Sequence, residues 1–114
     1  MTLTVQEVWE TVCRYSDLLP ERPVAALVDG EPIAVVRTYD GAVYAVAAVD
    51  PDCGAAVMPR GIVGDRGGVP VLISPMYKQA YSLVTGECLT KPGLALAVHP
   101  VRMVGAEIQV LAGG

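Results

Sequence analysis

The amino-acid sequence predicts an all-β protein, an antiparallel β sandwich or partial barrel. The chain has 114 residues, and nineteen of them are valines spread along its whole length. β-branched residues favour strands because their stiff side chains pack well on a pleated surface. Glycine or proline also interrupts the chain roughly every 8 to 12 residues, which is typical of short strands joined by turns. We expect a single domain over residues 1–114, a size that folds without disulfides or metals.

The start of the chain allows two interpretations. Thr4 and Glu7 have the spacing of a capping box, which would open a short helix. Residues 8–13 can instead form a first strand with Trp9 anchoring one face, and we prefer this second interpretation. Residues 16–20 should then form a turn, or a single helical turn that the proline at its end stops.

The Asp40-Gly41 pair between two apolar runs predicts a β-hairpin, because both residues tolerate the positive φ of a two-residue turn. This turn would place Arg37 opposite Tyr44. Both faces of the second strand, residues 42–49, are apolar, so we expect this strand to be central in its sheet and covered on both sides.

Two segments with little periodicity, residues 50–61 and 74–79, are expected to be loops. Residues 65–68 should form a turn, and a closing hairpin is expected about Gly105. In that hairpin, alternating polar residues predict one solvent-facing side. The strands predicted along the chain cover residues 8–13, 24–28, 33–39, 42–49, 62–63, 69–74, 80–84, 98–104 and 106–111.

The composition excludes several classes of protein. The net charge is −4 and the eight Lys and Arg residues are scattered, which does not favour nucleic-acid binding. No apolar run approaches the roughly 20 residues of a membrane span, and the N-terminus lacks the features of a signal peptide. We therefore expect a cytoplasmic protein without a membrane segment. A mean hydropathy of +0.46 suggests that some apolar surface faces a partner.

The three cysteines, Cys13, Cys53 and Cys88, are expected to be reduced, because an odd number without a leader does not indicate a disulfide framework. The sequence contains no CxxC motif. With His99 as the one histidine, a zinc site is not expected either.

The central part of the chain resembles the Rieske ferredoxin domain. That family holds a two-iron cluster between two loops, Cys-Pro-His and Cys-Pro-x-His, and the resemblance implies an antiparallel β sandwich or partial barrel with a small two-loop subdomain. The residues that carry the resemblance are Val43-Tyr44-Ala45-Val46, Asp50-Pro51-Asp52, Arg60-Gly61-Ile62-Val63-Gly64, Ser74-Pro75-Met76-Tyr77 and Leu83-Val84-Thr85-Gly86-Glu87.

The prolines and the spacing of the two loops match this family, but all four ligand types are missing. The former cluster-ligand positions are Asp50, Asp52, Ser74 and Tyr77. Carboxylate and hydroxyl oxygens replace soft thiolates poorly, and a tyrosine ligand would need a phenol with a reference pKa near ~10 to lose its proton. We therefore expect no cluster, no other metal and no catalytic residue on this chain.

A narrower resemblance rests on residues 74–79 and 83–88, which are similar to the small subunit of assimilatory NAD(P)H-dependent nitrite reductase. It implies an oxidoreductase subunit in the reduction of nitrite to ammonium. The family places FAD, sirohaem and a [4Fe-4S] cluster on a separate large subunit, which is the expected partner. This chain would then have a structural or assembly role.

The same scaffold leaves two alternatives open: a Rieske-type ferredoxin that carries electrons, and a Rieske-like binding module outside nitrogen metabolism. For the subunit hypothesis, the expected docking residues are Asp52, Tyr77, Lys78 and Gln79 at the tips of the two loops, although such loop tips are also often simply solvated.

Overall fold

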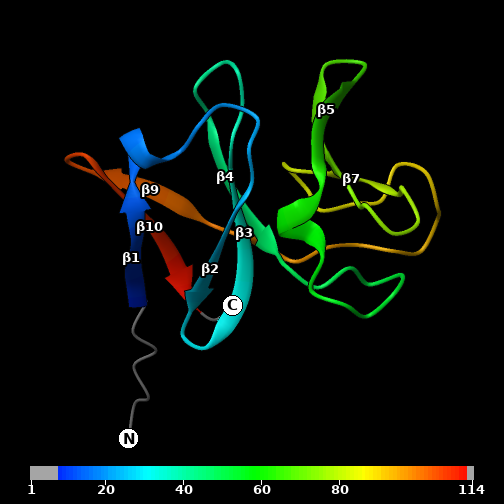
Figure 1. The fold of residues 1–114 in the computed structure, drawn as a ribbon, viewed down its shortest axis with the longest axis horizontal. Helices are drawn as coiled ribbons and strands as arrows, with labels where there is room; N and C mark the ends of the chain where they lie inside the picture. The colour runs from blue at the N-terminus through cyan, green and yellow to red at the C-terminus, as the bar shows by residue number, and fades with distance from the viewer. Residues whose placement is uncertain (1–7, 113–114) are drawn as a thin grey trace, which may run out of the picture.

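The computed structural model describes residues 8–112, and almost all regular structure in that range is β strand (Figure 1). The prediction of an all-β protein is thus confirmed, while the capping box at residues 4–7 lies outside the described residues. The elements are β1 (Val8–Arg14), η1 (Tyr15–Asp17), β2 (Val24–Val28), β3 (Glu31–Arg37), β4 (Val43–Ala47), η2 (Met58–Arg60), β5 (Ile62–Arg66), β6 (Val69–Ile73), β7 (Ala80–Ser82), β8 (Val98–His99), β9 (Val101–Val104) and β10 (Glu107–Ala112).

The strands form three antiparallel sheets. The orders are β1-β10-β9, β2-β3-β4-β8 and β5-β6-β7. The third sheet and the long loops around it form a separate lobe, at the right of Figure 1. In residues 8–112 no helix is long and apolar enough to cross a membrane.

Two apolar clusters pack on the opposite faces of the central sheet. Neighbouring residues of β4 point into different clusters: Val46 lies in the cluster shared with the third sheet, and Ala45 lies in the cluster shared with the first sheet. Both side chains are fully buried. Alternation along a strand sends successive side chains to opposite faces, so the expectation of a central strand covered on both sides is confirmed.

The hairpin between β3 and β4 differs from the prediction by one residue. Arg37 faces Val43, and Tyr44 faces Val36 instead. The Thr38 N–H donates to the Ala42 carbonyl over 2.9 Å, so the loop has three residues. Within it, only Gly41 has a positive φ, at 91°. A three-residue loop with a left-handed glycine is the second common hairpin type, which the Asp-Gly pair does not distinguish from the first.

Two further boundaries were predicted incorrectly. Strand β5 continues to Arg66, and the turn consists of Gly67 and Gly68, which both have positive φ. The strand expected at 98–104 is divided at Pro100 into β8, which pairs with β4, and β9, which pairs with β10. Proline has no N–H for a sheet ladder, and here the chain passes from one sheet to another.

Strand β7 ends two residues earlier than predicted, at Ser82. The Ser82 hydroxyl accepts hydrogen bonds from the backbone N–H groups of Val84 and Thr85, both over 3.1 Å. This local bonding gives the backbone an alternative to the sheet ladder and turns the chain.

Candidate functional site

The two loops that follow β4 and β6 meet in the small lobe. Each loop first closes on its own backbone: the Asp50 N–H donates to the Ala55 carbonyl, and the Ser74 N–H donates to the Gln79 carbonyl, each over 2.9 Å. These bonds hold Asp50 and Ser74 at the base of their loops, where both side chains are fully buried. The first former ligand position of each loop is therefore directed into the same buried region.

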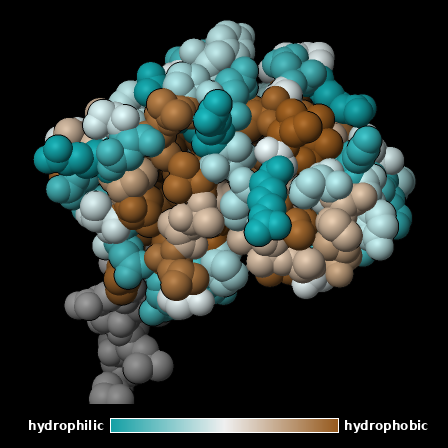
Figure 2. Space-filling model, in the orientation of Figure 1, coloured by the Kyte–Doolittle hydropathy of each residue, from teal (hydrophilic) through white to brown (hydrophobic). Residues whose placement is uncertain are grey.

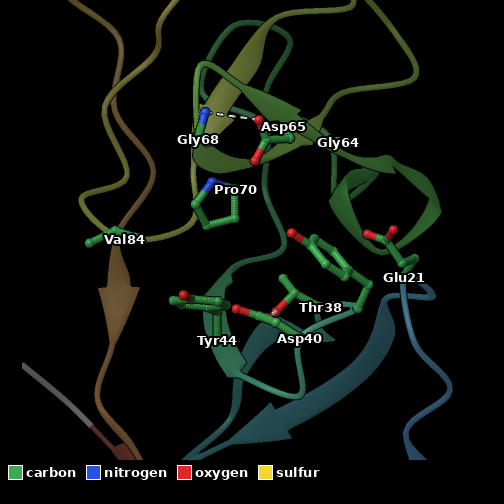
Figure 3. Close-up of a pocket in the computed structure, with 10 residues that line it drawn as sticks. Glu21, Thr38, Asp40, Tyr44, Gly64, Asp65, Gly68, Pro70 and Val84 are labelled. Atoms are coloured by element: carbon green, nitrogen blue, oxygen red, sulfur yellow. Dashed lines mark hydrogen bonds between the residues drawn. The ribbon is translucent and has the colours of Figure 1, made fainter.

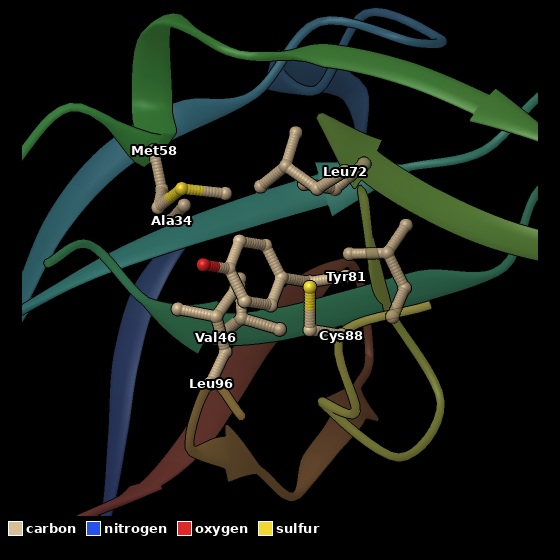
Figure 4. Packing of buried hydrophobic residues seen from close by; sticks show 9 residues of the cluster. Ala34, Val46, Met58, Leu72, Tyr81, Cys88 and Leu96 are labelled. Carbon is tan, nitrogen blue, oxygen red and sulfur yellow. The ribbon is translucent and has the colours of Figure 1, made fainter. Parts of the chain in front are cut away.

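Asp50 is the centre of a buried hydrogen-bond network. Its carboxylate accepts hydrogen bonds from the hydroxyl of Ser74, from the hydroxyl of Tyr81 over 2.9 Å and from the backbone N–H of Asp52 over 2.8 Å. We call these groups the Asp50 network. Tyr81 comes from β7 and its ring lies in the middle of an apolar cluster (Figure 4). The network therefore joins the first loop, the second loop and the third sheet.

The surroundings keep this network in one protonation state. Burial acts to raise the pKa of Asp50, but the hydrogen bonds from Ser74, Asp52 and Tyr81 outweigh it and hold the pKa below its usual value. Burial and the hydrogen bond to Asp50 raise the pKa of the Tyr81 phenol well above its usual value. At neutral pH, Asp50 is thus an acceptor and Tyr81 a donor, which matches the bonds observed.

Asp52 occupies the second former ligand position, and its side chain makes contacts nearer the surface than the Asp50 network. It accepts a hydrogen bond from Nε2 of Gln79 over 3.3 Å and pairs with Nζ of Lys91 at 2.9 Å. This is the one ion pair in the described part of the chain. The hydroxyl of Thr90 donates to Oε1 of Gln79 over 2.5 Å. Sequence reasoning missed Lys91 and Thr90, because their segment carries no motif.

The tip of the second loop is exposed. Tyr77, at the fourth former ligand position, is 58% exposed, and its neighbour Met76 is 53% exposed. Lys78 is also exposed and has a φ of 58°, in the left-handed region that non-glycine residues adopt rarely. Of the four former ligand positions, the structure thus brings Asp50, Ser74 and Asp52 together. Tyr77 is largely exposed and lines a shallow hollow with Asp52, Gln79 and Lys91.

The donor set does not fit an iron–sulfur cluster. Asp50 and Ser74 are hard oxygen donors that are already hydrogen-bonded to each other, and the Tyr77 side chain is largely in solvent. Cys88 is buried, and its Sγ atom already accepts a hydrogen bond from the backbone N–H of Lys91 over 3.3 Å. Within residues 8–112, no three His, Cys, Asp or Glu side chains lie together in a way that could hold a metal.

Away from the two loops, a hollow of about 420 Å³ lies between the β3–β4 hairpin and the β5–β6 hairpin (Figure 3). Three acidic residues line it, but two of them stabilise the turns themselves. Asp65 accepts the Gly68 N–H over 2.9 Å, and Asp40 accepts the hydroxyl of Thr38, which lowers the pKa of Asp40. Turn formation therefore accounts for two of the three acidic residues of this hollow.

Comparison with known families agrees with the fold and with the position of the two loops. Residues 8–111 match the family model described as the Rieske-like [2Fe-2S] domain, so this is a protein of the Rieske-like class. The ferredoxin of carbazole 1,9a-dioxygenase from Nocardioides aromaticivorans superposes with a TM-score of 0.78 at 26% identity, covering 93% of this chain and 97% of the ferredoxin.

Within that class, the similarity is more specific. The nitrite reductase (NADH) small subunit of Salmonella typhimurium is 30% identical over 103 residues, which cover 90% of this chain and 95% of the relative. A crystal structure from Mycobacterium tuberculosis, provisionally assigned as an NADH-dependent nitrite reductase small subunit, has a TM-score of 0.92 and 46% identity. The alignment covers 96% of this chain and 99% of that one. The chain belongs to the family of NAD(P)H nitrite reductase small subunits, with a Rieske-like domain that lacks the cluster ligands.

A third relative places a similar domain within a longer protein. The nitrite reductase [NAD(P)H] large subunit of Klebsiella oxytoca is 31% identical to this chain over 102 residues, which are 90% of this chain but 11% of that protein. In that relative, a domain similar to this chain is therefore part of the same polypeptide as the rest of a large subunit.

Proposed function

We propose that this chain is the structural small subunit of a cytoplasmic NAD(P)H nitrite reductase that reduces nitrite to ammonium in nitrate assimilation. The observation that carries the proposal is the Asp50 network, which joins the two loops at the positions where other Rieske domains have cluster ligands. A buried carboxylate with three donors holds the loops in a defined shape without a redox centre. The subunit would thus present a surface and would not carry electrons.

The proposed partner is a large subunit that carries FAD, sirohaem and a [4Fe-4S] cluster. The Klebsiella relative supports this pairing, because a domain similar to this chain occurs there within a large subunit. Two modules joined in one polypeptide meet at a high effective concentration, so a weak contact between them is enough. Two separate chains lack this advantage, and their contact surface must therefore bind more tightly.

The proposed docking surface is the tip of the two loops, Asp52, Tyr77, Lys78 and Gln79, which we call the docking tip. Three features favour it: an exposed aromatic side chain, a cation without an ion pair in the described residues, and a rigid base formed by the Asp50 network. The left-handed backbone at Lys78 supports the same view, since strained residues persist where the surrounding structure holds them and are frequent at binding sites.

Charge reversal at Lys78 tests the docking tip. In Lys78→Glu, we expect the dissociation constant for the large subunit to rise about tenfold, because a cation at the interface becomes an anion. The change in stability should stay within about 0.5 kcal/mol, since Lys78 is exposed. Affinity is measured by titrating the purified large subunit, and stability by urea unfolding.

Arg66→Glu is the matched control, because Arg66 is an exposed cation at the end of β5 and not in the docking tip. It should leave the affinity within about twofold. If Lys78→Glu and Arg66→Glu had equal effects, general charge and not the docking tip would govern binding.

Metal analysis of the purified chain tests the structural role. We expect no stoichiometric iron or acid-labile sulfide in protein produced with ample iron, together with capture of a sirohaem flavoprotein when the chain is used as bait. One cluster per chain would contradict the structural role and would instead support an electron carrier.

A further inference from the structure

Two neighbouring hollows of the molecule share part of their walls. One is the hollow of about 420 Å³ between the β3–β4 and β5–β6 hairpins, which we call the acidic hollow. The other, of about 310 Å³, lies at the turn that follows β7, and we call it the β7 groove. Gly68, Pro70 and Val84 line both, so the two form one continuous depression. Figure 3 shows Pro70 and Val84 across the acidic hollow from Asp40.

The β7 groove exposes apolar side chains. Val84 and Leu89 line it with 55% and 40% of their surfaces exposed, and Val69 and Pro70 line it as well. The hydroxyl of Ser82 already accepts two backbone N–H groups of the turn. Figure 2 shows that apolar side chains on this side of the molecule, at the right, are bordered by hydrophilic ones. Covering such an apolar surface with a partner is favourable, and larger exposed apolar patches often mark binding sites.

The acidic hollow carries charge of one sign. Glu21, Asp40 and Asp65 line it from three separate segments, and among the described residues no lysine or arginine lines either hollow. The rings of Tyr39 and Tyr44 also line it, and Tyr39 is 78% exposed. Carboxylates attract a cation, and the face of a tyrosine ring attracts one too. Both kinds of side chain therefore favour an occupant with positive charge.

The shared border restricts the occupant further. Lysine and arginine bury a long apolar stem and keep a charged end, so the stem can contact Pro70 and Val84 while the end reaches the carboxylates. In an extended segment, side chains two residues apart lie on the same face. An apolar residue two positions from the cation would thus reach the β7 groove. An apolar contact beside a charged one is also a common composition for an interface.

From this charge complementarity and the shared border, we propose that the acidic hollow and the β7 groove bind an extended segment of the nitrite reductase large subunit. The segment carries a lysine or arginine and, two residues away, an apolar side chain. The Klebsiella relative supports this source. The region similar to this chain is 11% of that protein, so the remainder is large enough to contact more than one surface of such a domain. The inference rests on the proposed function, since it names a second contact region of the same partner.

One substitution in each hollow tests the proposal. Glu21→Lys reverses a charge in the acidic hollow, and Val84→Lys introduces a charge at the border with the β7 groove. Both residues are exposed, so the fold should be retained, as urea unfolding will show. Each variant should raise the dissociation constant for the purified large subunit at least about tenfold, because it repels the cation or places a charge in an apolar contact.

Each variant has a matched control. Glu31→Lys makes the same charge reversal at an exposed position on β3 that lines neither hollow. Met103→Lys places a lysine at an apolar residue that is 57% exposed on β9 and also lines neither hollow. Both controls should change the affinity by less than about twofold.

Three results would overturn the inference. Unchanged affinity in Glu21→Lys and Val84→Lys would place the contact elsewhere. A loss in only one of them would contradict a segment that fills both hollows. Equal losses in the two controls would show that any added positive charge disturbs binding.

The parent chain separates this inference from the proposed function. If the parent chain does not bind the large subunit at all, the proposed function itself fails. If the parent binds, and Lys78→Glu weakens binding while Glu21→Lys and Val84→Lys do not, only the proposal for the two hollows is lost.

Discussion

At the scale of single residues, one aspartate determines the character of the site. Asp50 is fully buried, and a buried charge is tolerated only when its hydrogen-bonding capacity is well satisfied. Ser74, Tyr81 and the backbone of Asp52 provide that satisfaction. A residue that would be costly alone therefore becomes the group that holds two loops together.

Removing one hydroxyl from this network measures its strength. Tyr81→Phe keeps the buried ring and deletes one hydrogen bond to a charged acceptor, so the free energy of unfolding should fall by about 2 kcal/mol. Urea unfolding provides the measurement. Tyr77→Phe is the control, because Tyr77 is largely exposed, and it should change stability by less than about 0.5 kcal/mol. Equal stability of both variants would mean that Tyr81 contributes packing alone.

The network also predicts an acid dependence of stability. The pKa of Asp50 is lower in the folded protein than the ordinary value of 3.8, so the unfolded chain binds more protons near that pH. The stabilisation is fully present above the unfolded pKa and is lost as the pH falls through the folded one.

Asp50→Asn should therefore be less stable than the parent at neutral pH but should lose less stability on acidification. Urea midpoints of both proteins between about pH 6 and about pH 2 give the comparison. Parallel pH profiles of parent and variant would contradict the assigned role of Asp50.

At the scale of elements, the turn that follows β7 places strict demands on the backbone. Gly86 has a φ of 81°, and a Cβ at this position would lie 2.0 Å from the carbonyl oxygen of Leu96. The Gly86 carbonyl in turn accepts the Leu96 N–H over 2.8 Å. This close approach connects the small lobe to the segment that leads into β8, so the glycine is required for packing as well as for its backbone conformation.

A pair of alanine substitutions separates these two requirements. Gly67 also has a positive φ, 60°, but a Cβ there meets nothing within 4 Å. Gly67→Ala should cost about 1 kcal/mol from backbone strain alone, whereas Gly86→Ala should cost at least about 3 kcal/mol because backbone atoms must also move. Chemical denaturation of both variants gives the comparison, and similar losses would show that the contact with Leu96 relaxes easily.

At the scale of the whole molecule, the central sheet links the two apolar clusters. Because β3 and β4 contribute to both, neither cluster can be lost without exposing a face of the same sheet. We therefore expect the molecule to unfold in one cooperative transition, as small domains usually do.

Leu72→Ala tests this coupling across the molecule. Leu72 is fully buried in the cluster beside the third sheet, so the substitution should lower the free energy of unfolding by about 3 kcal/mol. The sole tryptophan, Trp9, lies on β1 in the first sheet and reports on the other side of the molecule. The urea midpoint of the Trp9 fluorescence transition should therefore fall by as much as the whole loss of about 3 kcal/mol requires. An unchanged Trp9 transition would mean that the small lobe unfolds separately.

The sequence by itself determined the fold class and most strands, because β-branched residues and turn pairs are local signals. It also identified the two loops and their missing ligands, since spacing around Pro51 and Pro75 is readable along the chain. The family similarity that these residues implied was confirmed by the comparisons.

Only the tertiary structure decided the hairpin register, the division of the last hairpin strand at Pro100, and the partners of Asp50 and Asp52. The register of the hairpin depends on whether its loop has two or three residues, and the Asp-Gly pair is compatible with both lengths. A proline permits the chain to pass from one sheet to another, but its presence in the sequence does not show that the chain does so. Lys91 reaches Asp52 from 39 positions along the chain, a contact that no local pattern encodes. Long-range contacts of this kind arise from packing, because they depend on where entire strands come to lie.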